Sequence, residues 1–538
     1  MATWTAAQVQ SAGAGPSAVG FANQTVREIV HTSIGGSQLR LRLSDAFDTA
    51  AVTVTRATVA LRQSGAALQA GTDSTVTVGG LASFVLPAHG VALTDPVDLQ
   101  VPPEADLAIS LYFAAPTGQT TWHPLALTTN YVAAGDQTAS LGSTPYSATT
   151  DSWYFLTGVD INAPTTTAGI VALGASTTDG LGSTPDTDRR WSDDLHRRIS
   201  STGQGQQLSV LNSGISGNRL LIDAGTDGQS GEHRLGPDAV GQPGARYVIV
   251  SSLGNNDIGF NQGPDGAPVT VAEMIAGYQQ MIGQAHAGGL MILGGTLTPD
   301  EGAFYSSSAG EAKRQAINQW ILTSGSFDAT INFGAAVADP TNPARILSAY
   351  DSGDHLHLND VGYQAMADAV DLSVFTTSGD PIANRYQSLG GPSSFLGEPT
   401  GAEQPVGTGR MRTFQGANIY WSPPTGAFEV HGAILAHYLA GGGPAGIAGF
   451  PTSDEQPTRG PGGRFNSFGV GVMDWSPPTG AFEVHGAILD RYLALGGTAS
   501  FLGFPTSDEF QVGPAGRQTN LQNGFINFSF TTGAVTVR

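Results

Sequence analysis

Two short segments far apart in the chain carry side chains that could act together as a nucleophile and its base. In the first, an apolar run ends at a glycine and leads into Ser176. In the second, about 180 residues later, Asp354 and His357 stand at a loop-to-helix junction. A serine hydroxyl becomes a nucleophile when an imidazole accepts its proton, and a carboxylate on the other ring nitrogen fixes the tautomer. These residues predict serine-hydrolase chemistry.

Such a serine has to lie on an exposed turn at the end of a buried strand. Between about residues 165 and 375, four apolar runs (169–173, 247–250, 290–293, 329–333) alternate with helix-like stretches (188–199, 271–287, 311–322, 362–370). Buried parallel strands separated by helices predict a three-layer α/β/α domain. We place this domain at residues 165–378, with Ser176 directly after its first strand.

The regions on either side follow other patterns. From about residue 26 to 162, short runs of period two are broken by Gly, Asp and Pro, which predicts an all-β, jelly-roll-like sandwich at residues 1–164. Later, residues 421–435 recur letter for letter as residues 475–489, an offset of 54. Related Gly-x-Pro-Thr segments at 395–400, 447–452 and 501–506 indicate three units, the last one degenerate. We expect a stacked repeat array with one continuous core at residues 379–538.

Composition narrows the classes of partner and cofactor. The 538-residue chain has a formal net charge of −21, which argues against nucleic acid and anionic membranes because both require clustered Lys and Arg. Cysteine is absent, which excludes thiolate chemistry. The single lysine, Lys313, follows an alanine, which excludes a Gly-Lys-Ser/Thr phosphate loop. No Gly-x-Ser-x-Gly or His-Glu-x-x-His motif and no stretch of about 18 apolar residues occurs. We expect no cofactor, no metal and no transmembrane segment.

Four ordered blocks in the central region strengthen the hydrolase prediction. They are Gly174-Ala175-Ser176, Asn212-Ser-Gly-Ile-Ser-Gly217-Asn, Gly254-Asn-Asn256-Asp257 and Asp354-x-x-His357. Together they resemble the SGNH (GDSL-like) hydrolase family over roughly 200 residues. The resemblance implies that Ser176 attacks an acyl carbon, that His357 serves as general base and then acid, and that Asp354 orients it. It also implies an oxyanion hole made by the backbone N–H groups of Ser176 and Gly217 and the side-chain amide of Asn256.

Two positions depart from the family pattern. The family usually has Asp where this chain has Ala175, and the Pro that often follows the histidine is Leu358. The first change removes a carboxylate that supports the turn around the nucleophile, but no group that attacks, transfers a proton or binds the oxyanion. His355 could be a rival base or one of a metal-binding pair. The Asp-x-x-His offset favours His357 instead and makes His355 a partly exposed neighbour.

The repeats contain their own histidines and tryptophans, which have two interpretations. His431 and His485 occupy one repeat position and could bind a metal, but a histidine inside a repeated string is better explained by packing or capping. Trp421 and Trp475 could stack on sugars, but small repeat units also need large core anchors. We favour the structural interpretation of both pairs.

The flanking regions also have family resemblances. The repeat segment Leu502-Gly-Phe-Pro505 and its variants resemble LGFP repeats, a family found on envelope-associated proteins of mycolate-containing actinobacteria and thought to hold them to the cell wall. The N-terminal region resembles the β-domain that precedes the catalytic domain in some bacterial family members. The N-terminal residues have no basic or apolar region of a signal peptide. This start of the sequence is compatible with a cytoplasmic protein or with a secreted protein whose signal peptide is not included. Because of the resemblance to LGFP repeats, we expect a secreted or wall-associated protein.

These resemblances imply a tethered serine esterase. We expect it to hydrolyse acyl esters on a cell-envelope polysaccharide or glycolipid through an acyl-enzyme, while the repeats bind wall polysaccharide and raise the local substrate concentration. One alternative is acyl transfer to a sugar hydroxyl by the same triad. A second alternative is a wall-binding protein whose hydrolase core has decayed.

Overall fold

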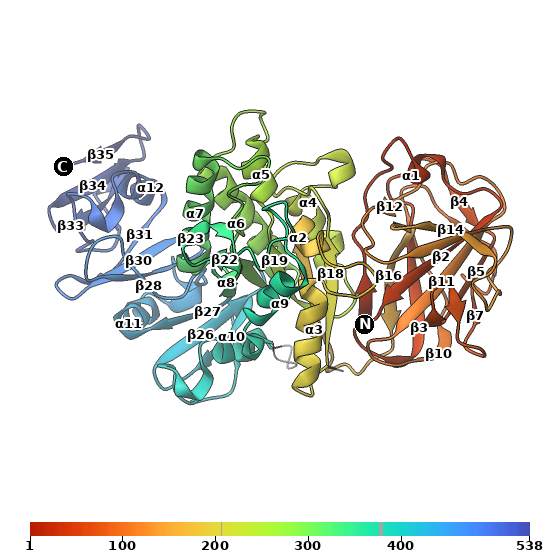
Figure 1. The fold of residues 1–538 in the computed structure, drawn as a ribbon. Helices are drawn as coiled ribbons and strands as arrows, with labels where there is room; N and C mark the ends of the chain where they lie inside the picture. The colour runs from red at the N-terminus through yellow and green to blue at the C-terminus, as the bar shows by residue number, and fades with distance from the viewer. Residues whose placement is uncertain (206, 376–379) are drawn as a thin grey trace. The chain divides into compact units, whose positions relative to one another are not determined.

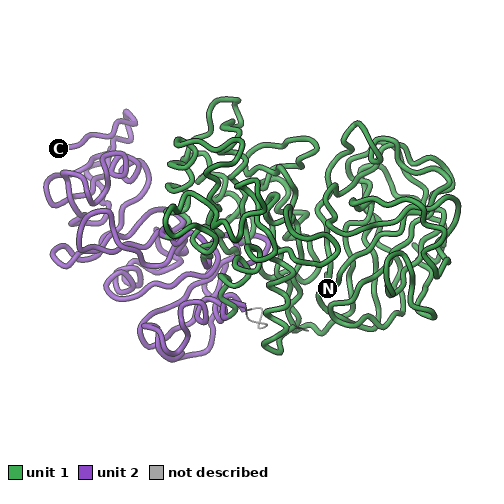
Figure 2. Tube along the Cα trace, in the orientation of Figure 1, with its two compact units in different colours: residues 1–285, 292–322, 330–372 green, residues 286–291, 323–329, 373–538 purple. Residues whose placement is uncertain are grey.

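The structure is a computed structural model that describes residues 1–205, 207–375 and 380–538 (Figure 1). Its internal contacts divide the chain into two compact units (Figure 2). The first comprises Met1–Ala285, Ile292–Leu322 and Thr330–Leu372, and the second comprises His286–Met291, Thr323–Ala329 and Ser373–Arg538. The domain boundary expected between residues 378 and 379 lies outside the described residues. The N-terminal boundary near residue 164 falls within the first unit.

The N-terminal region is the predicted all-β domain. One antiparallel sheet consists of β1 (Ala2–Thr5), β16 (Leu156–Ile161), β3 (Gly36–Ser44), β10 (Val97–Val101) and β9 (Val91–Leu93). The other consists of β14 (Tyr146–Thr150), β13 (Asn130–Ala134), β2 (Gln24–His31), β11 (Asp106–Phe113), β5 (Arg56–Ser64), β6 (Ala67–Leu68) and β7 (Ser74–Val76). Alternate side chains of both sheets share one core that includes Leu41, Val59 and Ile109. That alternation is the period-two pattern of the sequence.

Short elements complete this domain. They are α1 (Pro16–Val19), the pair β4 (Val52–Val54) and β8 (Phe84–Leu86), and the pair β12 (Trp122–His123) and β15 (Trp153–Tyr154). β12 places His123 in a buried position near the central domain. The N-terminal residues also contact the central domain, because the backbone N–H of Ala2 donates to the Pro243 carbonyl at 2.8 Å.

The central domain contains the predicted parallel sheet. Its strand order is β18 (Leu208–Gly214), β17 (Ala168–Gly174), β19 (Ala245–Ser251), β20 (Met291–Gly295) and β21 (Ala329–Ile331). β17 is parallel to both of its neighbours, and every one of its residues is buried, so its apolar run has no polar alternation.

Helices surround this sheet (Figure 1). They are α2 (Ser176–Asp179), α3 (Trp191–Ser201), α4 (Gly231–Leu235), α5 (Asn255–Phe260), α6 (Val271–Ala287), α7 (Ser308–Thr323), α8 (Phe333–Val337) and α9 (Asp360–Asp368). α3 packs against α9 and against β18. A small antiparallel pair, β22 (Ala338–Asp339) and β23 (Asn342–Ile346), precedes the loop to α9. None of the described helices is both long and apolar enough to cross a bilayer.

The C-terminal region is built from a repeated helix-and-sheet unit. Within residues 380–538 the helices are α10 (Pro381–Ser388), α11 (Gly432–Ala440) and α12 (Gly486–Ala494). The four-stranded sheets there are β24–β27 (Gln404–Val406, Gly409–Thr413, Ala417–Ser422, Gly426–His431), β28–β31 (Gln456–Pro457, Arg464–Ser467, Gly471–Ser476, Gly480–His485) and β32–β35 (Phe510–Gln511, Gly516–Leu521, Gly524–Ser529, Val535–Val537). α11 and α12 each contact the sheet before and the sheet after them. The buried apolar side chains around α10, α11 and α12 form three separate clusters, so the units stack without the single continuous core that the repeat pattern predicted.

Candidate active site

The structure brings the predicted serine, histidine and aspartate into one hydrogen-bonded chain. Ser176 is the first residue of α2, directly after the buried strand β17. Its Oγ lies 2.7 Å from Nε2 of His357, and Nδ1 of His357 lies 2.6 Å from Oδ2 of Asp354. With Asp354 ionised, Nδ1 carries the proton, and Nε2 is free to accept one from the serine hydroxyl.

The local fold holds Asp354 in its charged form. Its Oδ1 accepts hydrogen bonds from the backbone N–H groups of Leu356 and His357, at 3.0 and 2.8 Å, and from the Ser352 hydroxyl at 3.1 Å. Burial alone would raise the pKa of Asp354, but the His357 side chain and these backbone donors outweigh it and lower the pKa to about 2. The carboxylate is therefore ionised at any pH at which the imidazole can act as a base.

The predicted oxyanion donors stand at the ends of neighbouring strands. The backbone N–H groups of Ser176 and Gly217 donate no hydrogen bond to any other described residue, so both are available to a ligand. Gly217 has a φ of +80°, and a Cβ there would lie 2.6 Å from Cγ of Asp227. Position 217 therefore requires glycine, because its φ is positive and because a Cβ would collide with the Asp227 side chain.

Asn256 has one of its two amide hydrogens already engaged. Its Nδ2 donates to the Asn218 carbonyl at 2.9 Å, and its Oδ1 accepts from the Tyr305 hydroxyl at 3.3 Å. These bonds orient the amide and leave its second N–H for a substrate oxygen. Asn256 lies in the first turn of α5, after Gly254 at φ +121°, at the carboxyl edge of the parallel sheet.

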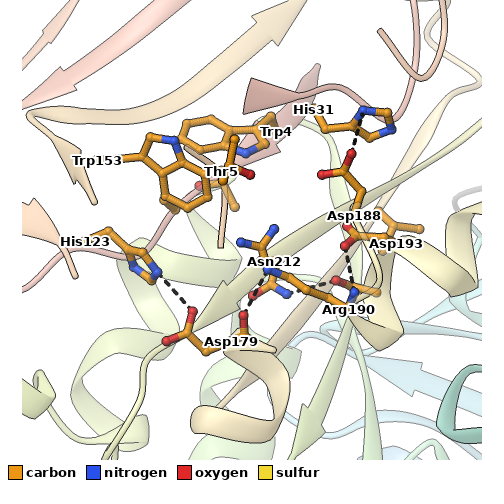
Figure 3. Close-up of a pocket in the computed structure, with 14 residues that line it drawn as sticks. Trp4, Thr5, His31, His123, Trp153, Asp179, Asp188, Arg190, Asp193 and Asn212 are labelled. Carbon is orange, nitrogen blue, oxygen red and sulfur yellow. Dashed lines mark hydrogen bonds and ion pairs between the residues drawn. The ribbon is translucent and has the colours of Figure 1, made fainter. Parts of the chain in front are cut away.

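A buried carboxylate, Asp179, joins the nucleophile helix to the loop that carries Gly217. Oδ2 of Asp179 accepts from both the backbone N–H and the hydroxyl of Ser216, each at 2.9 Å. Its Oδ1 lies 3.0 Å from Nε2 of His123, a residue of the N-terminal β-domain (Figure 3). Burial would lower the pKa of His123, but the Asp179 carboxylate raises it above its ordinary value. The β-domain thus supplies a buried partner to the carboxylate that holds the loop of Gly217, one of the predicted oxyanion donors.

Arg234 is a second framework residue that the sequence patterns did not indicate. Its fully buried guanidinium donates to the Gly174 and Ser213 carbonyls, both at 2.7 Å, and to Oδ1 of Asn218 at 2.8 Å. These acceptors are at the end of β17, on β18 and next to Gly217. One side chain therefore fixes the spacing between the nucleophile strand and the glycine loop.

The aspartate of the Gly-x-Asn-Asp block has a similar structural role. Asp257 is buried and accepts from the backbone N–H groups of Leu220 and Leu221, at 2.8 and 3.1 Å. Burial raises the pKa of Asp257, and these two donors oppose that rise. The bonds tie the end of the glycine loop to α5, which carries Asn256. No local sequence signal indicates this role, because the backbone groups that Asp257 reaches lie 36 and 37 residues away in the chain.

The departure at Ala175 leaves the nucleophile helix without a side-chain cap. Ala175 is the N-cap residue of α2, it is buried, and no side chain accepts a hydrogen bond there. The backbone of the turn is held instead by Asn212, whose Nδ2 donates to the Thr178 carbonyl at 2.6 Å. Asn212, the first residue of the glycine block, thus supports this turn, in which the aspartate usual in the family is replaced by Ala175.

His355 points to a different partner from His357. Its Nδ1 lies 2.6 Å from Oδ2 of Asp351, and its side chain is 57% exposed. The neighbouring histidine therefore has its own carboxylate and no hydrogen bond to Ser176 among the described residues.

One group of side chains could hold a metal by distance alone. The ligand atoms of His31, Asp106 and Asp188 lie within 4.8 Å of one another. Asp106 is already bound by His31 at 2.8 Å and by Arg62 at 2.9 Å, so two cations neutralise it. His31 and Asp188 border the cavity drawn in Figure 3, which also reaches Asp179. We therefore interpret this group as an ion-pair cluster that shares a cavity with Asp179.

The repeat histidines make equivalent contacts in two units. Nδ1 of His431 lies 2.8 Å from Oε2 of Glu429, and His485 forms the same pair with Glu483. Each histidine also precedes a helix as its N-cap residue. Trp421 is half-buried, and the guanidinium of Arg410 lies over its ring at 4.5 Å.

Comparison with known families agrees with this architecture. Residues 172–365 match the GDSL-like Lipase/Acylhydrolase family, and residues 396–446 and 449–500 each match the LGFP repeat. The central domain is a GDSL-like acylhydrolase domain, and it is followed by LGFP repeats. Two of the three structural units match the repeat family. A search among curated proteins gives no match.

Solved structures similar to the central domain include several esterases. A carbohydrate acetylesterase family member from Sinorhizobium meliloti is 15% identical, with a TM-score of 0.30, and the match covers 38% of this chain and 94% of that one. An aryl esterase from M. smegmatis is 16% identical, with a TM-score of 0.29, over 37% of this chain and 94% of that one. A putative arylesterase from Agrobacterium tumefaciens is 19% identical, with a TM-score of 0.29, over 38% and 95%.

Proposed function

We propose that this protein is a serine esterase that works through an acyl-enzyme formed on Ser176. The observation that carries the proposal is the continuous chain from Ser176 through His357 to Asp354, with contacts of 2.7 and 2.6 Å. The N–H groups of Ser176 and Gly217 follow neighbouring strands and have no acceptor among the described residues, and this supports the same reaction. A polarised hydroxyl next to free N–H donors is the arrangement that acyl transfer requires.

The proposed reaction has two balanced halves. In the first, Ser176 Oγ bonds to the ester carbonyl carbon while its proton passes to Nε2 of His357, and the oxyanion accepts hydrogen bonds from Ser176, Gly217 and Asn256. The carbon–oxygen bond to the alcohol then breaks, and the alcohol leaves with the proton from His357. In the second half, water attacks the acyl carbon and gives a proton to His357, and that proton returns to Ser176 as the carboxylic acid departs.

The substrate we propose is a short acyl ester on a cell-envelope polysaccharide or glycolipid. The repeats support an envelope location, since the LGFP family is associated with wall attachment. Attachment would hold the active site near immobile esters and raise their effective concentration. On this proposal the protein is secreted and acts at the wall.

Turnover of p-nitrophenyl acetate by wild type and Ser176→Ala tests the esterase proposal. We expect Ser176→Ala to lose at least about 10³-fold in kcat, because the variant lacks the hydroxyl on which the acyl-enzyme forms. A fluorophosphonate probe should label wild type and leave the variant unlabelled. Equal rates in the two proteins, or labelling at another residue, would refute the assigned nucleophile.

Wall attachment needs a separate test. A chain ending at Phe375 should still turn over p-nitrophenyl acetate, which checks that it has folded, but should no longer sediment with isolated cell walls. Undiminished sedimentation would show that the repeats do not hold the protein there.

Acyl transfer to a sugar hydroxyl is the second candidate. Asp354 is half exposed and Ser176 is partly exposed, so an alcohol acceptor can approach the same site as water. Product analysis with an added sugar acceptor separates the two reactions. A non-catalytic protein would give neither product.

A further inference from the structure

Two exposed aromatic side chains of the central domain lie beside each other. Among the described residues of 1–375, Phe260 and Phe304 are the only Phe, Tyr or Trp side chains in an exposed position, at 46% and 80%. Phe260 ends α5 and Phe304 lies on the loop between β20 and α7, yet their ring centroids are 6.3 Å apart. A single exposed apolar residue needs no explanation, but two rings brought together from separate segments indicate a surface that a ligand covers.

Tyr305 connects these two rings to a predicted oxyanion donor. Its ring centroid lies 5.6 Å from that of Phe260 and 4.5 Å from that of Phe304. Its hydroxyl donates to Oδ1 of Asn256 at 3.3 Å, so the same side chain also orients the amide that is expected to bind the oxyanion. We call Phe260, Phe304 and Tyr305 the aromatic surface. It begins at Asn256 and ends at the exposed ring of Phe304.

The loop before α7 also borders the predicted triad. A Cβ at Gly302 would lie 3.1 Å from the ring of His355, which is on the same loop as Asp354. Burial raises the pKa of Tyr305, and the Asp300 and Asp354 carboxylates raise it further, so the charge of Asp354 acts on this side chain. The loop thus extends from the triad aspartate to the oxyanion residue on α5. The aromatic surface therefore lies at the rim of the predicted active site, at the carboxyl edge of the parallel sheet.

Arg219 adds hydrogen-bond donors at the edge of the aromatic surface. It lies just after Gly217, and its guanidinium carbon is 4.7 Å from the ring centroid of Phe260. Nη1 donates to Oε1 of Gln262 at 3.3 Å. Nε is buried, whereas Nη2 is accessible and has no hydrogen-bond partner among the described residues. A planar cation stacked on a phenyl ring can therefore donate to an oxygen of a ligand that lies on the same surface.

The chemistry of this surface matches a sugar ring better than a long acyl chain. One face of a pyranose presents C–H groups that pack on an aromatic ring, while its hydroxyls lie at the edge and accept hydrogen bonds. A flat ring needs contact on one face only, which an exposed side chain such as Phe304 supplies. A flexible chain gains most when it is enclosed in a pocket, and a ring this exposed encloses nothing.

We propose that the aromatic surface and Arg219 form a subsite for a sugar ring, the alcohol part of the ester. The C–H face of the sugar packs on Phe304 and Phe260, and a ring hydroxyl accepts from Nη2 of Arg219. No bond forms or breaks at this subsite, so its residues act by binding and positioning the substrate. The inference rests on the proposed esterase function and deepens it, because it names sugar esters rather than long-chain acyl esters as the substrate class.

Kinetics of Phe304→Ala on two acetate esters test the subsite. Methyl 6-O-acetyl-β-D-glucopyranoside has a sugar ring, and 1-acetylglycerol is a hydroxylated ester without one. We expect kcat/KM to fall about 5-fold for the sugar ester and to change less than about twofold for the glycerol ester. Each comparison is made on one ester, so differences in intrinsic reactivity cancel. Phe304→Tyr keeps a ring and should retain the wild-type values. Equal losses on both esters in Phe304→Ala, or no loss on either, would overturn the proposal.

Further variants and one further ester define what the surface binds. Phe501→Ala removes a 66% exposed phenylalanine of the repeats and should leave both kcat/KM values unchanged. Arg219→Gln should lower kcat/KM for the sugar ester about 3-fold, mainly through KM. An unchanged KM in Arg219→Gln would overturn the role given to this arginine. Turnover of 1-octanoylglycerol tests the acyl alternative. If Phe304→Ala impaired that ester and spared the sugar ester, the surface would bind acyl chains and the proposal would be wrong.

A binding measurement separates the subsite from catalysis. Calorimetric titration of Ser176→Ala with the methyl acetylglucoside should give saturable binding, and the added change Phe304→Ala should weaken that binding at least about 5-fold. If wild type hydrolyses 1-acetylglycerol but neither kinetics nor binding depends on Phe304, the subsite fails and the esterase stands. If no ester is hydrolysed but binding of the sugar ester depends on Phe304, the esterase fails and the subsite stands.

Discussion

The catalytic framework and the repeat region use buried hydrogen bonds in opposite ways. Around Ser176, Asp179 and Arg234 each make contacts that are not repeated among the described residues: Asp179 binds Ser216 and His123, and Arg234 binds three separate segments. In the repeats, the same hydrogen bond, from a helix tyrosine hydroxyl to a glycine carbonyl, recurs in each of the three units. Unique contacts fix one geometry, whereas repeated contacts add similar increments of stability.

This contrast predicts whether a substitution will change the rate of acyl transfer or the stability of the fold. A change in the catalytic framework should alter the rate of acyl transfer more than the stability, because rate depends on placement within a fraction of an ångström. A change in a repeat should alter stability and leave the rate on a small soluble ester unchanged. The predictions below test that separation in order of decreasing effect.

The largest effect is expected from Asp354→Asn. An amide can donate to Nδ1 of His357 and so favour the wrong tautomer, which should lower kcat for p-nitrophenyl acetate by about 10⁴-fold with little change in KM. His355→Asn is the matched control, because His355 is exposed and binds Asp351, and asparagine tolerates its φ of +63°. A large loss of kcat in the control, or a small loss in Asp354→Asn, would contradict the proposed roles.

The fold and the contact between Asp354 and His357 were predictable because their signals are local in sequence. Buried apolar runs alternating with helical stretches predicted the parallel sheet, period two predicted the β-sandwich, and the 54-residue offset predicted the stacked units. The Asp-x-x-His spacing sufficed for the pairing of Asp354 with His357, since both residues lie on one loop.

The framework residues could not be predicted in the same way. His123 lies 56 residues from Asp179 and in another domain, and Arg234 reaches Gly174 across 60 residues. Nothing in the spacing of a lone histidine or arginine shows which carboxylate or carbonyl it meets after the domains pack.

A smaller effect on rate is expected from loss of the link between the β-domain and the nucleophile helix. His123→Ala leaves the buried Asp179 carboxylate without that partner, and the Ser216 loop that carries Gly217 should shift. We expect kcat to fall about 10- to 100-fold with KM nearly constant, and His123→Gln to recover part of the rate through its amide donor. If the contact of His123 with Asp179 had no influence on the position of the Gly217 loop, both variants would keep the wild-type kcat.

The same pair predicts a pH dependence of stability. The pKa of His123 is raised in the folded state, so its ion pair contributes fully below the unfolded pKa of about 6.5 and is lost as pH rises through the folded pKa. The difference in urea midpoint between wild type and His123→Gln should therefore be largest below pH 6 and should shrink at higher pH. A difference that grew with pH would reverse the assigned direction.

The smallest effects are expected in the repeats. Tyr438→Phe and Tyr492→Phe each remove one hydroxyl that donates to a glycine carbonyl, at 2.6 and 2.8 Å, and each should lower the free energy of unfolding by about 1 kcal/mol. Because the two bonds are equivalent and lie in separate units, the double variant should lose about the sum, within about 0.5 kcal/mol. Turnover of p-nitrophenyl acetate should stay at the wild-type rate throughout. Strong non-additivity, or a fall in kcat, would mean that the repeats form a unique network like that around Ser176, and the contrast between the two regions would fail.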